Sequence, residues 1–168
     1  MFSHIWLLAY VASVVLVNIG FSIIPPVMTP LGLFAPMAIL VGGIFILRDY
    51  AQRESGHKVL FAMAVGAILS YFLASPYVAL ASAAAFAVSE LVDWLVYTYA
   101  KNKPFRERVL LSSAISTPID TTIFLLGISA FSVGTFLIMV MSKMLAVAIV
   151  WYLHKPADPI EMHFYTRG

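Results

Sequence analysis

The sequence predicts an all-α membrane protein with six transmembrane helices and both termini in the cytoplasm. Hydrophobic residues make up 62% of the 168 residues and charged residues only 11%, whereas roughly 25% of a soluble domain is charged. Apolar runs recur at about the 20 residues that a spanning helix needs. Lys and Arg gather in every second connection, as the positive-inside rule describes. We expect one domain over residues 1–168.

The six predicted helices are the successive apolar runs of the chain. They cover residues 5–24, 31–47, 59–75, 77–100, 109–127 and 131–153. The first run has no basic segment before it and is longer than the apolar part of a signal peptide, so we expect it to remain as the first helix. No alternation with a period of two residues is present, which disfavours a membrane β-barrel.

The breaks between these runs carry residues that end helices or prefer water. In chain order they are Pro25-Pro26 with Thr29-Pro30, the polar segment 48–58, Ser75-Pro76, the basic segment 101–108, and residues 127–132. Proline lacks the amide donor that a helix interior needs, and charged side chains are costly in lipid. Each break therefore predicts a change of direction at a membrane surface.

The basic residues outside the spans all fall on one predicted side. They are Arg48, Arg53, Lys58, Lys101, Lys103, Arg106, Arg108, Lys155 and Arg167. The loops of the opposite side carry neither Lys nor Arg. This asymmetry predicts cytoplasmic termini and a multi-pass protein of the cell (inner) membrane. Membrane topology explains these basic loops better than nucleic-acid binding does, so we expect the lipid bilayer, and no nucleic acid, as a partner.

Four charged residues lie well inside the predicted spans: Glu90, Asp93, Asp120 and Lys143. By the helical rise of about 1.5 Å per residue, each lies roughly 12–18 Å from the polar end of its helix. The hydrocarbon core is about 30 Å thick, so all four are expected near its midplane. A shared depth favours a common site over unrelated substitutions.

Three interpretations of these charges remain open. The fourth helix could be held by one salt bridge to Lys143, although one lysine cannot neutralise three carboxylates. The charges could line a polar cavity, which is the usual place for ionisable groups in membranes. A carboxyl could also be protonated and serve proton coupling. The spacing of three, four and seven residues groups Glu90 with aromatic side chains on one helical face. The predicted substrate-binding residues are Glu90, Asp93, Trp94, Asp120, Lys143, Asn18, Phe86 and Tyr97.

Two other polar segments carry predictions about local structure. The hydroxyl-rich stretch 111–124 contains Pro118, so we expect a kink or break in the fifth helix near 114–118, aiming Asp120 at the midplane. Arg48 and Asp49 follow the second apolar run, so we expect an interfacial ion pair whose longer side chain reaches toward water.

Several motifs of other protein classes are absent from the sequence. The chain has no Cys, no Walker sequence, and neither the G-x-G-D motif of intramembrane aspartyl proteases nor a rhomboid-type G-x-S-x with a His inside the membrane. The four histidines lie in loops or near the ends of the chain. We therefore expect no enzyme activity, no cofactor and no metal site.

Three motifs resemble those of the putative vitamin uptake transporters, also described as queuosine precursor transporters. They are RD-x-x-Q at 48–52, SE-x-x-D at 89–93 and P-x-D-T-x-x-F at 118–124. The resemblance runs in order from about residue 31 to residue 153. It implies a six-helix membrane protein that imports 7-cyano- or 7-aminomethyl-7-deazaguanine for tRNA modification.

The residues of the predicted site suit such a ligand. One carboxylate can accept both the N1–H and the N2–H₂ donors of a deazaguanine, and an aromatic ring can stack on its face. The alternatives are a proton- or cation-coupled carrier, or the vitamin-binding subunit of a multi-component importer, with a different small substrate. Such a subunit needs a docking face, for which Ala9 and Ser13 are the candidate. The oligomeric state stays open.

Overall fold

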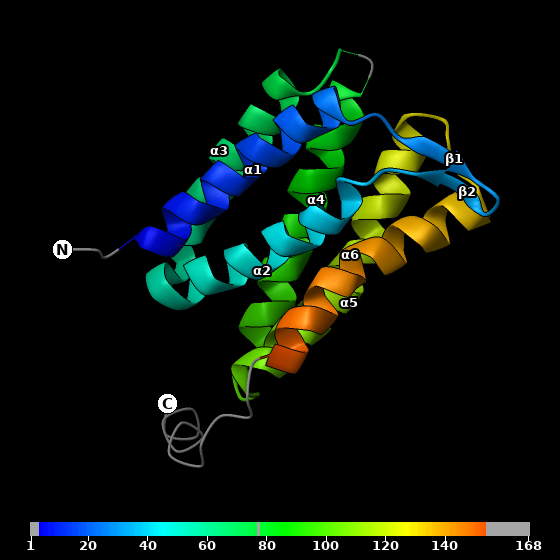
Figure 1. The fold of residues 1–168 in the computed structure, drawn as a ribbon. Coiled ribbons are helices and arrows are strands. Elements are labelled where there is room, and N and C mark those ends of the chain that lie inside the picture. The colour runs from blue at the N-terminus through cyan, green and yellow to red at the C-terminus, as the bar shows by residue number, and fades with distance from the viewer. Residues whose placement is uncertain (1–3, 77, 154–168) are drawn as a thin grey trace.

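The computed structural model describes residues 4–76 and 78–153. Its helices are α1 (Ile5–Ile23), α2 (Ala38–Ser55), α3 (Val59–Leu73), α4 (Ala79–Tyr99), α5 (Phe105–Gly127) and α6 (Val133–Leu153), with a 3-10 turn, η1 (Gly56–Lys58), between α2 and α3. Two short strands, β1 (Val27–Thr29) and β2 (Gly32–Phe34), pair in antiparallel fashion between α1 and α2. The described part of the chain is therefore α-helical apart from this hairpin (Figure 1).

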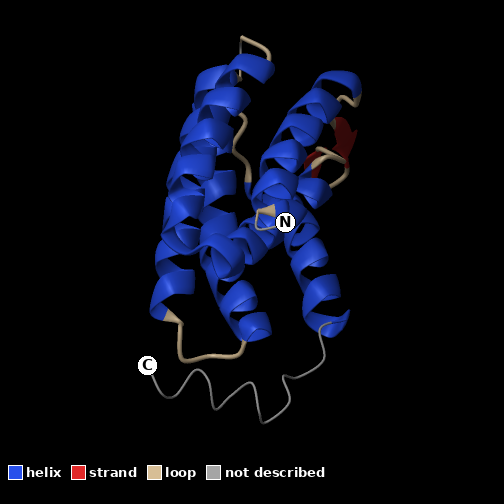
Figure 2. Ribbon diagram, turned by 90° about the vertical axis from the view of Figure 1, so that its left-hand side faces the viewer, coloured by secondary structure: helices blue, strands red, loops and turns tan. Residues whose placement is uncertain are grey.

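Helix α2 is the centre of the bundle. It packs against each of the other helices, whereas α1, α3, α4, α5 and α6 each contact only some of their neighbours. Figure 2 shows the helices as long rods with the hairpin beside one end. A helix surrounded by the others can carry polar side chains only where those side chains find partners inside the protein.

The interior of the bundle contains polar residues beside its apolar core, and many large apolar side chains face outward. On α4 the buried positions include Ser89, Glu90 and Asp93, which repeat at helical spacing on one face. Leu80 and Leu91 lie on the opposite side and are exposed. Exposed leucines on every turn would be costly in water, whereas lipid solvates them well. A buried polar face and an exposed apolar face are what a membrane helix that lines a polar interior requires.

The second helix begins later than the sequence analysis predicted. Residues 31–37, which were expected to open it, instead form β2 and the connection to α2. Gly32 adopts a φ of +140°, which other residues rarely adopt, at the turn of the hairpin. The backbone amide of Leu33 donates to Thr135 Oγ1 at 3.0 Å, so the hairpin is tied to α6. Prolines around the hairpin explain the delay, because they cannot supply the amide donors of a helix.

The predicted polar loop at residues 48–58 is largely helical, and this prediction was wrong. Helix α2 continues to Ser55, and the chain turns only at Gly56, whose φ is +59°. Arg48 and Asp49 consequently lie inside the bundle, where both are fully buried. They are not an interfacial pair, and Arg48 does not belong to the basic loops.

The fifth helix was predicted to be kinked or broken near residues 114–118; the break is absent, and the kink stays a prediction. Helix α5 is a continuous helix through Pro118. Ser116 and Thr117 beside the proline are fully buried. An unbroken α5 still carries Asp120 into the interior, so the position of that carboxylate does not depend on a discontinuous helix.

Five helical stretches among the described residues are long and apolar enough to cross a membrane, and one of them is the continuous stretch Ala38–Leu73 that contains α2, η1 and α3. Six crossings and cytoplasmic termini stay predictions, and Lys155 and Arg167 lie outside the described residues.

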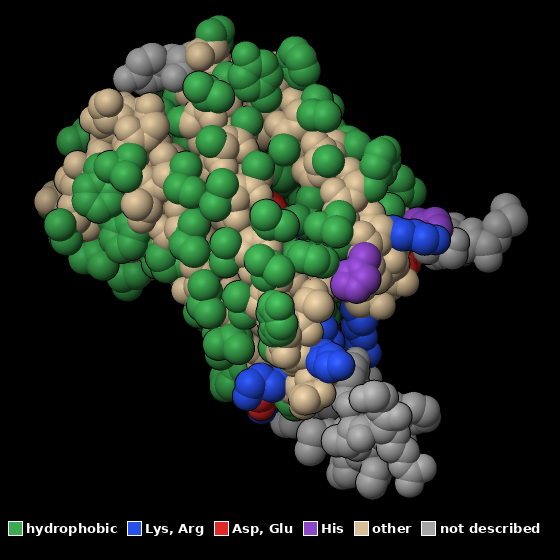
Figure 3. Space-filling view, turned by 180° about the vertical axis from the view of Figure 1, so that it is seen from behind, with side chains coloured by type: hydrophobic (Ala, Val, Ile, Leu, Met, Phe, Trp, Pro, Cys, Tyr) green, Lys and Arg blue, Asp and Glu red, His purple; other side chains and the backbone are tan. Residues whose placement is uncertain are grey.

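Figure 3 shows hydrophobic side chains over most of one face, with Lys and Arg gathered at one end. We call that end, formed by residues 56–58 and 100–108, the basic end, and the opposite one, formed by the β hairpin and residues 74–76 and 128–132, the hairpin end.

Candidate functional site

Two groups of buried charges occupy the interior of the bundle. The first is the charged pair, Asp120 of α5 and Lys143 of α6. Lys143 Nζ donates to Asp120 Oδ2 and, at 3.0 Å, to Thr121 Oγ1. The hydroxyl of Ser89 donates to the other carboxylate oxygen of Asp120 at 3.2 Å. The pair is electrically balanced, and its hydrogen bonds connect α4, α5 and α6.

Close helix contact holds Lys143 in place. A Cβ atom at Gly42 of α2 would overlap the backbone carbonyl of Lys143, so only glycine permits this approach of α2 to α6. The next residue, Gly43, has open space at the same point. The glycine at 42 therefore sets the distance between the central helix and the backbone that carries the lysine.

The charged pair lines an inner cavity of about 60 Å³. The inner cavity lies between α1, α2, α3, α4, α5 and α6, and its walls also include Asn18, Phe86 and Phe124. Asn18 accepts a hydrogen bond from Ser70 at 3.4 Å, and Ser70 lies 2.9 Å from Ser82. The lining of the inner cavity thus combines two charged groups, neutral polar groups and aromatic rings.

An outer cavity of about 220 Å³ continues from the inner one toward the hairpin end. Both cavities share five lining residues, which are Asn18, Phe21, Ser82, Phe124 and Met139. The outer cavity is mostly apolar and reaches Pro26, Leu33 and Ile128 at the hairpin end. A small molecule that enters at this end would meet apolar surface first and the charged pair last.

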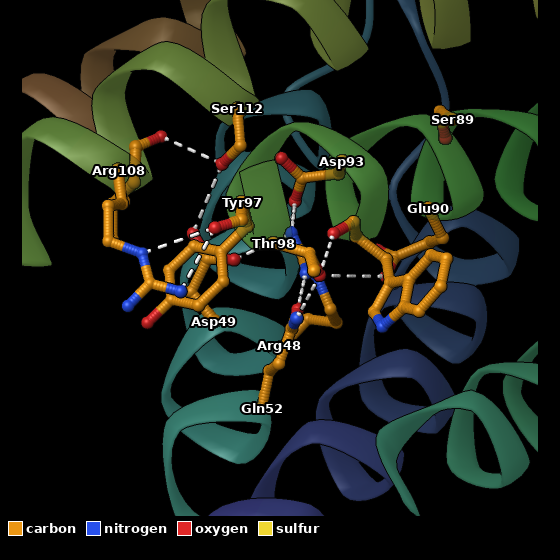
Figure 4. Close-up of polar contacts among 12 residues, drawn as sticks. Arg48, Asp49, Gln52, Ser89, Glu90, Asp93, Tyr97, Thr98, Arg108 and Ser112 are labelled. Atoms are coloured by element: carbon orange, nitrogen blue, oxygen red, sulfur yellow. Dashed lines mark hydrogen bonds and ion pairs between the residues drawn. The ribbon is translucent and has the colours of Figure 1, made fainter. Parts of the chain in front are cut away.

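The second group, the Arg48 cluster, consists of Arg48, Asp49, Glu90 and Asp93 and lies nearer the basic end. Arg48 is fully buried and forms ion pairs with Asp93, with Asp49 at 2.6 Å and with Glu90 at 3.7 Å. Figure 4 shows Arg48 of α2 among these side chains and near Tyr97. All three carboxylates are fully buried. None of the four residues lines the inner or outer cavity.

Neutral groups complete the Arg48 cluster. Tyr10 donates its hydroxyl to Glu90 Oε2 at 3.1 Å, and Ser112 donates to Asp49 Oδ2 at 3.3 Å. Arg48 donates to Gln52 at 2.5 Å, and Gln52 donates in turn to Thr98 at 2.8 Å. These bonds join α1, α2, α4 and α5, so the cluster closes the interior on the side of the basic end.

The structure divides the eight predicted site residues between two places. Four of them line the inner cavity: Asn18, Phe86, Asp120 and Lys143. The other four lie outside its walls: Glu90, Asp93, Trp94 and Tyr97. The Trp94 ring packs edge-on against His57 with centroids 5.5 Å apart, and the Tyr97 ring lies under Arg48 and Arg108. A role of these four in binding stays a prediction.

Arg48 and Asp49 are members of the polar interior that were not predicted from the sequence. The absence of any glycine or proline between residues 44 and 55 was the available signal, because it favours a helix that runs past both residues. Charge balance was a second signal, since three carboxylates and one lysine require a further cation. Among the described residues no group of three or more His, Asp and Glu side chains could hold a metal ion.

A family profile described as putative vitamin uptake transporter matches residues 7–157. No curated protein and no solved structure gave a significant match to the chain. The profile covers most of the chain, and the chain therefore belongs to the putative vitamin uptake transporter family. It is a multi-pass membrane protein, and its family indicates a transporter for the uptake of a vitamin or another small molecule rather than an enzyme.

Proposed function

We propose, from this membership, that the protein imports a 7-deazaguanine precursor of queuosine through the two cavities. The family assignment supports transport of a small molecule, and the resemblance of the motifs at 48–52, 89–93 and 118–124 suggests the deazaguanine. Import requires the hairpin end to face the outside, which agrees with the predicted cytoplasmic location of the basic end.

The observation that carries this proposal is a cavity with aromatic walls that ends at a single buried carboxylate and a single buried ammonium. At about 10–15 Å³ per water molecule, the inner cavity holds a few waters or the polar edge of one ring. The outer cavity of about 220 Å³ accommodates the rest of a small ring system. Phe86 and Phe124 border the inner cavity, where they can stack on a planar ligand.

Asp120 is the group that we assign to the guanine-like edge. An ionised carboxylate offers about four acceptor positions, and Ser89 and Lys143 occupy two of those of Asp120. The remaining positions can accept the N1–H and N2–H₂ donors of the ligand as charge-assisted hydrogen bonds. Lys143 and Asn18 then remain for the acceptors of the ligand.

Uptake of 7-cyano-7-deazaguanine by cells that cannot make it, with and without this protein, is the primary test. Competition by other purines for uptake identifies which edge of the ligand the carboxylate binds. Guanine should compete for uptake, whereas adenine and hypoxanthine, which lack the N2 amine, should compete poorly. A missing donor leaves a buried charged acceptor unpaired, which costs about 1–3 kcal/mol or more, and sites built on such bonds strongly reject such analogues. Adenine competing as well as the deazaguanines would contradict this assignment.

A vitamin or another small substrate is the second candidate, and the description of the matching family favours it. The same cavities and the same charged pair would bind it. Uptake of a panel of vitamins by the same cells separates the two candidates, since the deazaguanine proposal requires that none of them displaces 7-cyano-7-deazaguanine.

A further inference from the structure

The Arg48 cluster contains more negative charge than the protein neutralises. Among the described residues, Arg48 is the one basic side chain within ion-pair distance of Asp49, Glu90 or Asp93. One guanidinium against three carboxylates leaves two negative charges without a counter-charge if all groups are ionised. Buried ions cost several kcal/mol each unless they are paired, so the cluster requires a further positive charge from outside the chain.

A second observation shows where that charge would bind. Glu90 Oε1 and Asp93 Oδ1 are buried oxygens with no hydrogen-bond partner among the described residues. Asp93 makes a direct contact with Arg48, whereas Glu90 lies 3.7 Å from Arg48 Nε. Glu90 is thus the carboxylate that the arginine neutralises least. A buried carboxylate with a free oxygen can bind a proton, and among the described residues no group of three His, Asp or Glu side chains could hold a metal ion there.

The surroundings of Glu90 include groups from every helix that packs on it. The titratable and charged ones are Tyr10 of α1, Arg48 and Asp49 of α2, Asp93 of α4 and Asp120 of α5. Helix α3 contains no charged residue. The acidic neighbours of Glu90 therefore outnumber the basic one.

On α4, residues near Glu90 line the inner cavity or bond to a residue that lines it. Ser89, its neighbour on α4, donates to the carboxylate of Asp120, which lines the inner cavity. Phe86, one helical turn earlier, also lines that cavity. A proton at Glu90 would therefore lie one residue along α4 from the serine that donates to the charged pair.

We propose that Glu90 binds a proton that enters from the cavities and leaves at the basic end, so that substrate uptake is driven by proton entry. The proton passes from water to Glu90 Oε1, where an O–H bond forms, and that bond breaks when the proton is released to water on the other side. No other group is consumed. Proton binding does not depend on the identity of the substrate, whereas the coupling rests on the proposed transport function.

Infrared difference spectra of the purified protein between acidic and alkaline buffers test proton binding without any substrate. The expected result is a carbonyl band of a buried protonated carboxyl group that shifts when glutamate is labelled with ¹³C and is lost in Glu90→Gln. The matched control is Glu107→Gln, because Glu107 is an exposed residue of the basic end that is 3.9 Å from Lys103. If the wild-type spectra contain no glutamate band that changes with pH, the proposal is overturned, whether or not Glu90→Gln folds.

Uptake of 7-cyano-7-deazaguanine into proteoliposomes tests the coupling. An inward proton gradient should raise accumulation in the wild type, and a protonophore should abolish the increase. Glu90→Gln should lose the increase in accumulation that the proton gradient gives, whereas the control Glu107→Gln should retain it. Substrate accumulation by the wild type that does not change with the proton gradient would overturn the coupling. Absence of uptake under every condition, with the glutamate band present, overturns the deazaguanine assignment and leaves the proton site intact.

Discussion

The charged pair and the Arg48 cluster differ in charge balance and in access. The pair has one carboxylate and one ammonium and lines a cavity, whereas the cluster has three carboxylates and one guanidinium and lies outside both cavities. A balanced pair beside a cavity can exchange hydrogen bonds with a ligand at little electrostatic cost. An unbalanced, enclosed cluster instead changes its energy strongly with each proton that it gains or loses. In the mechanism that we propose, the charged pair recognises the substrate and the Arg48 cluster couples its uptake to proton entry.

The largest effect should come from removing the cation of the cluster. Arg48→Met leaves three buried carboxylates without a guanidinium, and loss of one partner of a buried ion pair costs about 3–5 kcal/mol. We expect little folded protein after solubilisation, measured by size-exclusion chromatography and thermal unfolding. Lys103→Met at the exposed pair of the basic end is the control and should behave as the wild type. Normal stability of Arg48→Met would contradict the described role of Arg48.

Next in size is the effect of breaking the charged pair. Asp120→Asn and Lys143→Gln should each destabilise the protein by a similar amount, about 3–5 kcal/mol, because each leaves a buried charge alone. The double variant restores neutrality and should recover most of the stability. It should not transport, since it lacks the carboxylate that we propose binds the guanine-like edge. Recovery of uptake in the double variant would show that the pair is only structural.

A smaller effect is expected from two neighbouring glycines. Gly42→Ala should push α2 away from the backbone of Lys143, lowering both the midpoint of thermal unfolding and uptake. Gly43→Ala, with open space at its Cβ position, is the matched control, and alanine there should be neutral or stabilising by up to about 1 kcal/mol through helix propensity. Equal effects of the two changes would refute a close contact at Gly42 alone.

The smallest effect concerns an aromatic wall of the cavities. Phe124→Leu keeps an apolar side chain but removes the ring, and stacking on a base is worth about 1–3 kcal/mol. Half-saturating concentrations of substrate should therefore rise roughly tenfold, with maximal uptake preserved. Phe61→Leu, at an exposed position on α3, should leave the half-saturating concentration unchanged. A fall in maximal uptake alone would place Phe124 outside the binding step.

The fold was predictable where composition dictates it. Apolar runs and their prolines located helices that overlap α1 to α6, because lipid demands both length and hydrophobicity. The hairpin at 27–34 was not predictable in this way, since its strands are three residues each and are held by α6, over a hundred residues later. The end of α2 was misplaced because charge was taken as a sign of water, whereas Arg48 and Asp49 find partners inside the bundle.

The candidate site was predictable in part for the same reason. Charged residues within apolar runs pointed to Asp120 and Lys143, which the structure joins. The sequence grouped Glu90 with these residues. Helical spacing shows that Glu90 shares a face with Phe86, but it does not show that the cavity reaches Phe86 and not Glu90, one turn further along α4. Only tertiary packing, with Phe86 at the cavity and Tyr10 against Glu90, makes this distinction.

The pairing of Asp120 with Lys143 also bears on the order in which the protein is assembled. The two residues lie on successive helices, 23 positions apart, so Asp120 is synthesised before its partner. A solitary carboxylate is costly in the bilayer, by about 2.5–3.5 kcal/mol on the scale of biological insertion. Helices α5 and α6 are therefore expected to enter the membrane together as one hairpin, with each charge accompanied by its partner. A chain that stops before Lys143 would retain α5 poorly in the bilayer.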